Sequence, residues 1–220
     1  MTEIIPAIIP KSFDDLRENV SKVSSFVPLV QIDIVDGVFV PSKGWPYTDS
    51  QTNISEDTAV LHLLGVAFEV DLMVTSPEDV VLQWVDAGAS RIIIHIESTD
   101  NMDKTIEVIR NTDTSVEIGI AINTDTEVDR LSEFIPKIDF VQCMGIAKIG
   151  YQGQPFDERV ISQIRALKSK YADIIISVDG GVTLDTAPKL IEAGASRLVS
   201  GSAIFKSDDI STTILNFKSL

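Results

Sequence analysis

Short apolar runs rich in β-branched residues alternate along this sequence with longer amphipathic stretches. Most runs are nearly continuous, which is typical of parallel strands buried on both faces. Eight such runs in a 220-residue chain without a proline-, glycine- or serine-rich linker predict one domain over residues 1–220, a single closed (β/α)8 TIM barrel in which a helix follows each strand. An open α/β sheet is the alternative. The predicted strands are Ile4–Ile9, Leu29–Val35, Ala67–Val74, Arg91–Ile96, Val116–Ile122, Ile138–Cys143, Ile174–Val178 and Arg197–Ser200.

Helix start and stop signals lie between these strands. Ser12 precedes a predicted helix at Phe13–Phe26, and a serine–proline pair opens another at Glu78–Ala87. Two near-duplicate segments each place a glycine, Gly88 or Gly194, where a helix ends and a strand follows. This internal echo indicates one repeated β/α unit.

The charge balance limits the partners that this chain can have. With 33 acidic and 18 basic residues, its net charge is −15, and such a chain is repelled by nucleic acids and anionic membranes. We therefore expect neither as a partner, and any phosphate must be held by backbone N–H groups and local dipoles. The N-terminus lacks the pattern of a secretory signal, and no apolar run could span a bilayer. The single cysteine, Cys143, is expected to be a buried small hydrophobe, and we predict a cytoplasmic protein.

Carboxylates gather where the predicted strands end, which is the face where barrels of this kind carry their sites. Asp33, Asp71 and Asp179 belong to three different strands, and Gln31 shares a face with Asp33 because alternate strand residues point the same way. Carboxylates inside an apolar barrel are costly unless they are paired or bind a metal, so we predict a functional role for Asp33 and Asp179. For Asp36 we expect only a loop anchor or helix cap.

Glycine turns follow the predicted sixth, seventh and eighth strands. Turns without a Cβ atom let backbone N–H groups approach a phosphate, although the same glycines can serve only to make tight turns. The three adjacent turns predict a phosphate site. Its residues would be Gly150, Gly153, Gln154, Gly180, Gly181, Gly201 and Ser202.

Two connections are long for loops that follow strands. They cover Ser42–Asn53 and Ile146–Pro155, and long loops at a functional face are often lids. We predict that both cover the site. Trp45 and Tyr151 would then close over the ligand or pack on the barrel rim.

The segment from Gln31 to Pro41 resembles the His-x-Asp-x-Met-Asp-Gly-x-Phe-Val-Pro signature of the ribulose-phosphate 3-epimerase family. Five further segments match that family in order, so the resemblance runs over nearly the whole chain. They are Asp71–Pro77, His95–Glu97, Met144 with the loop to Phe156, Val178–Gly181 and Gly201–Phe205.

The resemblance implies an enzyme that inverts C3 of a ketose phosphate, for example by converting ribulose 5-phosphate to xylulose 5-phosphate. In that family the aspartates matching Asp33 and Asp179 move protons on opposite faces of the substrate through an enediolate. A divalent metal, held by two histidines and the same two aspartates, stabilises the developing oxyanion.

This chain departs from the family pattern around the metal. The two histidine positions hold Gln31 and Asp71, so that Gln31, Asp33, Asp71 and Asp179 would form an all-oxygen site. Such a site suits Mg²⁺ or Mn²⁺ better than Zn²⁺. His95 lies next door, but in an isoleucine-rich strand we expect it to be hydrogen-bonded core.

Other departures from the family pattern lie outside the metal positions. Val35 replaces a methionine of the strand-two motif, and Ala7 and Pro10 stand where two serines are usual near the first strand. The strand-six loop has one extra residue and carries Gln152 in place of a glycine. The rebuilt metal site is compatible with a changed substrate.

Two alternatives to the epimerase stay open. One is an isomerase or epimerase for a different phosphosugar; the other is a non-catalytic barrel that binds a sugar phosphate, favoured by the missing histidines and opposed by the retained Asp33 and Asp179. Related decarboxylases and hexulose-phosphate synthases carry an Asp-x-Lys-x-x-Asp motif, which is absent at Asp71–Ser76. We further expect a small phosphorylated sugar as ligand and no organic cofactor, and we allow for a homo-oligomer.

Overall fold

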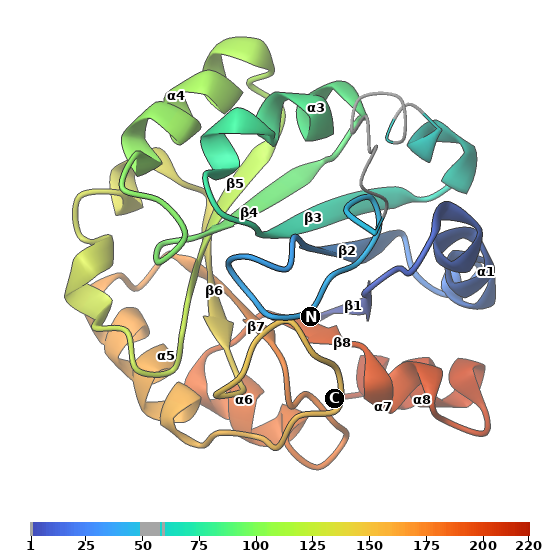
Figure 1. Cartoon of the computed structure of the whole chain (residues 1–220). Helices are drawn as coiled ribbons and strands as arrows, with labels where there is room; N and C mark the ends of the chain where they lie inside the picture. The colour runs from blue at the N-terminus through green and yellow to red at the C-terminus, as the bar shows by residue number, and fades with distance from the viewer. Residues whose placement is uncertain (1, 49–57, 59) are drawn as a thin grey trace.

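The computed structural model describes residues 2–48, 58 and 60–220, and in this part of the chain eight strands close into a barrel (Figure 1). Each strand pairs in parallel with the next along the sequence, and β8 returns to β1. The predicted single barrel is confirmed, with strand ends within two residues of those expected. The strands are β1 (Glu3–Ile8), β2 (Leu29–Val35), β3 (Ala67–Met73), β4 (Arg91–His95), β5 (Glu117–Ile122), β6 (Phe140–Met144), β7 (Ile175–Asp179) and β8 (Arg197–Ser200).

Helices surround the barrel (Figure 1). Among the described residues, none is long and apolar enough to cross a membrane. In the part of the chain that the structure describes, the α-helices are α1 (Phe13–Val23), α3 (Val81–Asp86), α4 (Met102–Thr112), α5 (Arg159–Lys170), α6 (Ala187–Ala193), α7 (Ser202–Phe205) and α8 (Ile210–Lys218). The 3-10 helices are η1 (Leu61–Leu64), η2 (Pro77–Asp79), η3 (Val128–Leu131) and η4 (Ile135–Lys137).

The prediction that a helix follows every strand is wrong after β5. Only η3 and η4 lie between β5 and β6. Pro136 stands at the start of η4, and proline has no amide hydrogen with which to continue an α-helix. The chain therefore crosses this face of the barrel in two short 3-10 turns.

The predicted helix at Glu78–Ala87 is divided into η2 and α3. Ser76 has a left-handed backbone with φ of 53° and makes no side-chain cap, and Val80 interrupts the helical path with φ of −121°. Ser12 does cap α1, because its Oγ accepts a hydrogen bond from the backbone N–H of Asp15 at 3.1 Å. The echoed glycines behave as predicted: Gly88 and Gly194 have φ of 89° and 120° at their helix ends.

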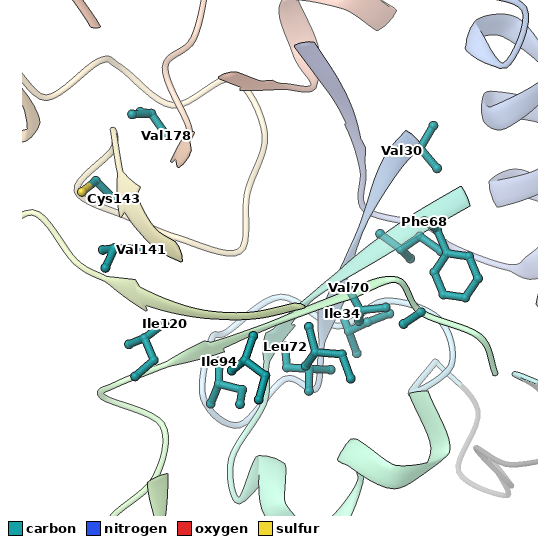
Figure 2. Close-up of a cluster of buried hydrophobic side chains, with 14 of the residues drawn as sticks. Val30, Ile34, Phe68, Val70, Leu72, Ile94, Ile120, Val141, Cys143 and Val178 are labelled. Atoms are coloured by element: carbon teal, nitrogen blue, oxygen red, sulfur yellow. The ribbon is translucent and has the colours of Figure 1, made fainter. Parts of the chain in front are cut away.

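The outward-facing side chains of the strands form one apolar layer with the helices. Figure 2 shows part of this layer, including Val70 and Leu72 of β3 and Ile94 of β4. The helices contribute residues such as Leu16 and Trp84 to the same cluster. Cys143 is buried in this layer, as expected from the sequence (Figure 2). Burial on this face and in the interior explains the continuous apolar runs of the strands.

The inward-facing side chains differ in chemistry from one end of the barrel to the other. At the N-terminal ends of the strands, Arg91 contacts Glu3, Glu69 and Glu117 within 3.1–3.4 Å, and Arg197 contacts Glu3 and Glu117. Burial raises the pKa of Glu69 to about 8, although the nearby arginines oppose this shift. This ionic cluster closes the N-terminal end. The C-terminal end carries the polar residues described next.

Candidate active site

Three carboxylates meet inside the C-terminal end of the barrel. Asp33 of β2 pairs in register with Asp71 of β3, and Asp179 ends β7. All three are buried, and each offers an oxygen that lies within 4.8 Å of the other two. The structure therefore brings together the aspartates that the strand ends predicted, with Gln31 on the same inner face.

Gln31 joins two of these carboxylates through a single nitrogen. Its Nε2 donates to Oδ1 of Asp33 at 2.7 Å and to Oδ2 of Asp179 at 2.8 Å. The opposite amide orientation would place Oε1 against two carboxylates, where it could only repel them. In the present orientation Oε1 is buried and has no hydrogen-bond partner among the described residues.

Asp71 accepts hydrogen bonds from a separate set of side chains. His95 Nε2 lies 3.1 Å from its Oδ1, and Gln142 Nε2 donates to its Oδ2 at 3.0 Å. Ser177 in turn donates to Oε1 of Gln142 at 3.3 Å. The prediction that His95 is hydrogen-bonded core is confirmed, since it is buried and packs against the ring of Phe39, yet its partner belongs to the carboxylate cluster.

The sequence reasoning missed Gln142 and Ser177. Both lie on strands, where alternate residues point to the same face. Gln142 stands two residues before Met144 and pairs with Ser177 of β7, so the sequence could have indicated that both face inward. A buried polar residue needs partners, and these two find them in each other and in Asp71.

Burial and mutual repulsion shift the acidity of this centre. Burial, reinforced by Asp179 and Asp71, raises the pKa of Asp33 well above its ordinary value. Burial and Asp71 raise the pKa of Asp179 to about 7, against the opposing hydrogen bond from Gln31. Burial opposes protonation of His95, but the Asp71 carboxylate outweighs it with help from Glu97, so the pKa of His95 is raised. A raised pKa was expected for three carboxylates this close, and it suits proton transfer near neutral pH.

The cluster fits a hard divalent cation. Asp33, Asp71 and Asp179 can each supply a carboxylate oxygen. Such an oxygen donor set matches ions that prefer carboxylates and carbonyls. Coordination through Oε1 of Gln31 stays a prediction, because the contacts in the structure are made by its nitrogen.

A cavity of about 220 Å³ opens above the carboxylates. Asp33 and Asp179 line it, whereas Gln31 and Asp71 lie beneath its surface. All residues predicted for the phosphate site are in the same wall. They are Gly150, Gly153, Gln154, Gly180, Gly181, Gly201 and Ser202.

Packing already explains three of these glycines, since Gly150 has φ of 83° and a Cβ on it would lie 2.7 Å from Ser42 and 2.8 Å from Val40. Gly180 and Gly181 have φ of 91° and 67°, and a Cβ on either would collide with Ile146 or Phe156 of the β6–α5 connection. A tight turn therefore accounts for their identity. Gly201 is different, because its missing Cβ would point at a polar side chain of the cavity wall, Gln152. The phosphate role of the whole set stays a prediction.

The two loops predicted as covers touch each other. Ser42 Oγ donates to the carbonyl of Gly150, and in Figure 1 the blue loop after β2 and the gold loop after β6 lie across the mouth of the barrel. Residues 49–53 of the first predicted cover lie outside the described residues. Tyr151 lines the cavity, whereas Trp45 packs on the rim against Trp84. Opening and closing of these loops stay predictions.

Asp36 anchors the first of these loops, as expected. Its Oδ1 accepts hydrogen bonds from the backbone of Val38 and Phe39, and its Oδ2 accepts one from Thr75 after β3. The carboxylate thereby ties the loop after β2 to the neighbouring strand end. It makes no contribution to the cavity wall.

Two further residues beside the cavity were missed by the sequence reasoning. Gln152 lines the wall, and Nζ of Lys206 lies 3.6 Å from the point that a Cβ on Gly153 would occupy. The same point is 4.0 Å from Oγ of Ser202, so the exposed Lys206 stands at the outer edge of the predicted phosphate site. Its spacing was a usable signal, because Lys206 follows Ser202 by four residues, one helical turn.

Comparisons with known proteins identify the family of this chain. The profile of the Ribulose-phosphate 3 epimerase family matches residues 3–205. The ribulose-phosphate 3-epimerase of Chlamydia muridarum is 34% identical over 189 residues, which are 83% of this chain and 78% of that protein. The ribulose-phosphate 3-epimerase of Bacillus subtilis is 30% identical over 215 residues, which are 95% of this chain and 94% of that protein.

Solved structures of similar fold include more distant proteins. KGPDC from Streptococcus mutans superposes with a TM-score of 0.75 at 14% identity, covering 99% of this chain and 96% of that one. The 3-hexulose-6-phosphate synthase of Salmonella typhimurium gives a TM-score of 0.73 at 13% identity, covering 100% and 97%. At such identities the likeness shows the fold alone.

Proposed function

Because the chain belongs to the ribulose-phosphate 3-epimerase family, we propose that it inverts C3 of a ketose phosphate, with ribulose 5-phosphate and xylulose 5-phosphate as the first pair to test. One geometric observation carries this proposal. Asp33 and Asp179 come from strands far apart in the sequence, share the nitrogen of Gln31, and line the same cavity. Epimerisation needs two such groups beside one carbon.

The protonation of this pair suits the reaction. One carboxylate must be ionised to take the C3 proton, while the other must be protonated to return a proton to the opposite face. Burial and mutual repulsion raise the pKa of both groups, so the pair retains a proton at a pH where isolated aspartates have lost theirs. Gln31 holds both carboxylates in place through the loss and the return of the proton.

The enediolate formed between the two proton transfers places negative charge on substrate oxygen. A divalent ion at such a site supplies positive charge close to that oxygen. Asp33, Asp71 and Asp179 would hold it, with Oε1 of Gln31 as an additional donor. For this oxygen set we propose Mg²⁺ or Mn²⁺ rather than Zn²⁺.

The phosphate of the substrate would lie at the glycine turns of the cavity wall. The charged residues among the described lining are Asp33 and Asp179, both acidic, so backbone N–H groups must supply most of the binding. Lys206 adds one positive charge near Gly153 and Ser202. We therefore propose that the phosphate binds at the β7–β8 side of the cavity, with the sugar over the carboxylates.

A decarboxylase or synthase activity has less support. The fold neighbours include such enzymes, but the window from Asp71 to Ser76 holds Met73 where their motif has lysine. Two other functions are distinguished from the proposed one by experiment: epimerisation of a different ketose phosphate, and binding of a sugar phosphate without turnover. Neither is favoured by a particular contact of the site.

The direct test is to incubate the purified protein with ribulose 5-phosphate, with and without Mg²⁺, Mn²⁺, Fe²⁺ or Zn²⁺, and to follow xylulose 5-phosphate. We expect turnover that Mg²⁺ or Mn²⁺ supports and that is lost when both Asp33 and Asp179 are replaced by asparagine. Tight binding of several ketose phosphates without turnover under every condition would instead support the non-catalytic barrel.

A further inference from the structure

Gln152 lies in the β6–α5 connection, between Gly150 and Gly153. The side chain spans the cavity wall, because its Nε2 donates to the carbonyl of Ala7 in β1 at 3.0 Å, across 145 residues of sequence. The amide also lies directly on the turn after β8. A Cβ at Gly201 would be 2.6 Å from Nε2 of Gln152 and 3.0 Å from the Ala7 carbonyl. One amide therefore meets both β1 and the β8 turn.

The side-chain amide of Gln152 can form more hydrogen bonds than it makes with the described residues. A glutamine side chain carries two N–H donors and a carbonyl acceptor. Within the described part of the chain, Gln152 uses one N–H on Ala7 and makes no other hydrogen bond. It lines the cavity together with Gly201 and Ser202, so an anchored donor with a free N–H stands in the wall where the phosphate is proposed to bind.

The charges around the cavity make such a donor useful. A phosphate dianion entering this site meets the negative charge of Asp33 and Asp179, and the described lining contains no lysine or arginine. A neutral amide provides a polarised N–H without forming an ion pair with those carboxylates. A hydrogen bond from it to a charged phosphate oxygen is stronger than one between neutral groups.

We propose that Gln152 binds the substrate phosphate with its free N–H, while its bond to Ala7 holds the β6–α5 loop over the cavity. This role rests on the function proposed above, since the ligand is taken to be a phosphorylated sugar. Gln152 then adds to the discrimination of phosphorylated from unphosphorylated ketoses, beside the backbone N–H groups of the glycine turns. In Figure 1 the gold loop that carries it passes over the β1–β8 side of the barrel mouth.

The test uses Gln152→Met, which keeps the volume but removes the donor, and Gln152→Glu, which keeps the shape but adds a negative charge. Titration calorimetry with inorganic phosphate and steady-state kinetics on the ketose phosphate are the readouts. We expect Gln152→Met to raise the Kd for phosphate and the KM about tenfold, with kcat changed less than about twofold. Gln152→Glu should raise both values further. Gln83→Met, on α3 and outside the cavity wall, is a control for the loss of a glutamine side chain.

Two outcomes separate this role from the proposed function. If the wild type turns over the ketose phosphate while Gln152→Met keeps wild-type phosphate affinity and KM, the role of Gln152 is wrong and the function stands. If the wild type shows no turnover but the Gln152 variants lose phosphate affinity as expected, the phosphate role stands and the epimerase proposal fails. A loss of kcat and protease resistance with unchanged phosphate affinity would reduce Gln152 to a structural latch and overturn the proposal.

Discussion

Gln31 and Asp179 are 148 residues apart in sequence, yet the amide nitrogen of Gln31 lies 2.8 Å from Oδ2 of Asp179. The same nitrogen reaches Asp33 at 2.7 Å. One neutral donor thus stabilises the negative charge of two buried carboxylates. Position 31 holds a metal-binding histidine in the family signature. In this chain the side-chain amide of Gln31 instead connects the two proposed catalytic carboxylates through hydrogen bonds.

Replacing Gln31 with methionine should destabilise the protein more at pH 8 than at pH 5. The hydrogen bonds from Gln31 lower the pKa of both aspartates, so their loss raises those pKa values further. A raised pKa favours the folded state at low pH and disfavours it as pH rises. We expect a loss of about 2–3 kcal/mol at pH 8 and clearly less at pH 5, measured by urea unfolding.

Gln163→Met is the matched control for that experiment. Gln163 is also a buried glutamine that donates two hydrogen bonds, but to the backbone carbonyls of Asn123 and Thr126. Its replacement should cost stability equally at both pH values. Equal losses at pH 5 and pH 8 for Gln31→Met as well would contradict the role assigned to Gln31.

The paired variant Gln31→His and Asp71→His should bind Zn²⁺ more tightly than the wild type. It replaces two oxygen donors by imidazoles, which suit Zn²⁺, and leaves Asp33 and Asp179 as the other ligands. Competition against a zinc chelator should show a gain of at least about tenfold, with no matching gain for Mg²⁺. Unchanged Zn²⁺ affinity in a folded variant would mean that these positions do not face the metal.

The pH dependence of kcat/KM should be bell-shaped and centred near neutral pH. Burial raises the pKa of Asp179 to about 7 and that of Asp33 well above its ordinary value. At low pH both carboxylates are protonated and the base is lost; at high pH both are ionised and the acid is lost. Added Mg²⁺ should move the maximum to lower pH, because a nearby cation lowers both pKa values. A rate that is flat from pH 5 to pH 9 would argue against this pair.

At the opposite end of the barrel, Glu69→Gln should make the protein more stable at pH 9 but not at pH 5. Burial raises the pKa of Glu69 to about 8, so the folded state keeps a proton that the unfolded chain releases. The stability that this group contributes is complete below its ordinary pKa and is lost as pH rises through 8. In urea unfolding the variant should be more stable than the wild type at pH 9, by a gain that the loss of the ion pair between Glu69 and Arg91 reduces. Glu107→Gln, on the exposed face of α4, should show no such gain.

Much of the fold could be predicted because parallel strands buried on both faces have a simple pattern. The run Leu29–Val35 coincides with β2, and the helix-end glycines Gly88 and Gly194 have the expected backbone. The missing helix after β5 and the division at Val80 could not be predicted in the same way. The division follows from the non-helical backbone at Val80, with φ of −121°, and Pro136 has no amide hydrogen with which to continue an α-helix; the hydrophobic periodicity expresses neither feature.

The site was predictable where it depends on strand parity and strand ends. Asp33, Asp71 and Asp179 meet because parallel strands place their C-terminal ends at one face. The partners that organise them were harder to find. Gln142 belongs to no recognisable motif, although it donates to Asp71. The hydrogen bond from Gln152 to Ala7 connects residues 145 positions apart and depends on the conformation of one long side chain.

The most direct measurement of the central claim is exchange of the C3 proton of ribulose 5-phosphate with deuterium, followed by NMR in D₂O. The wild type with Mg²⁺ or Mn²⁺ should exchange this proton, and Asp179→Asn should slow the exchange by about 10²–10⁴-fold while phosphate binding stays nearly intact. Wild-type protein that binds ketose phosphates but exchanges no C3 proton with Mg²⁺, Mn²⁺, Fe²⁺ or Zn²⁺ would contradict the epimerase account.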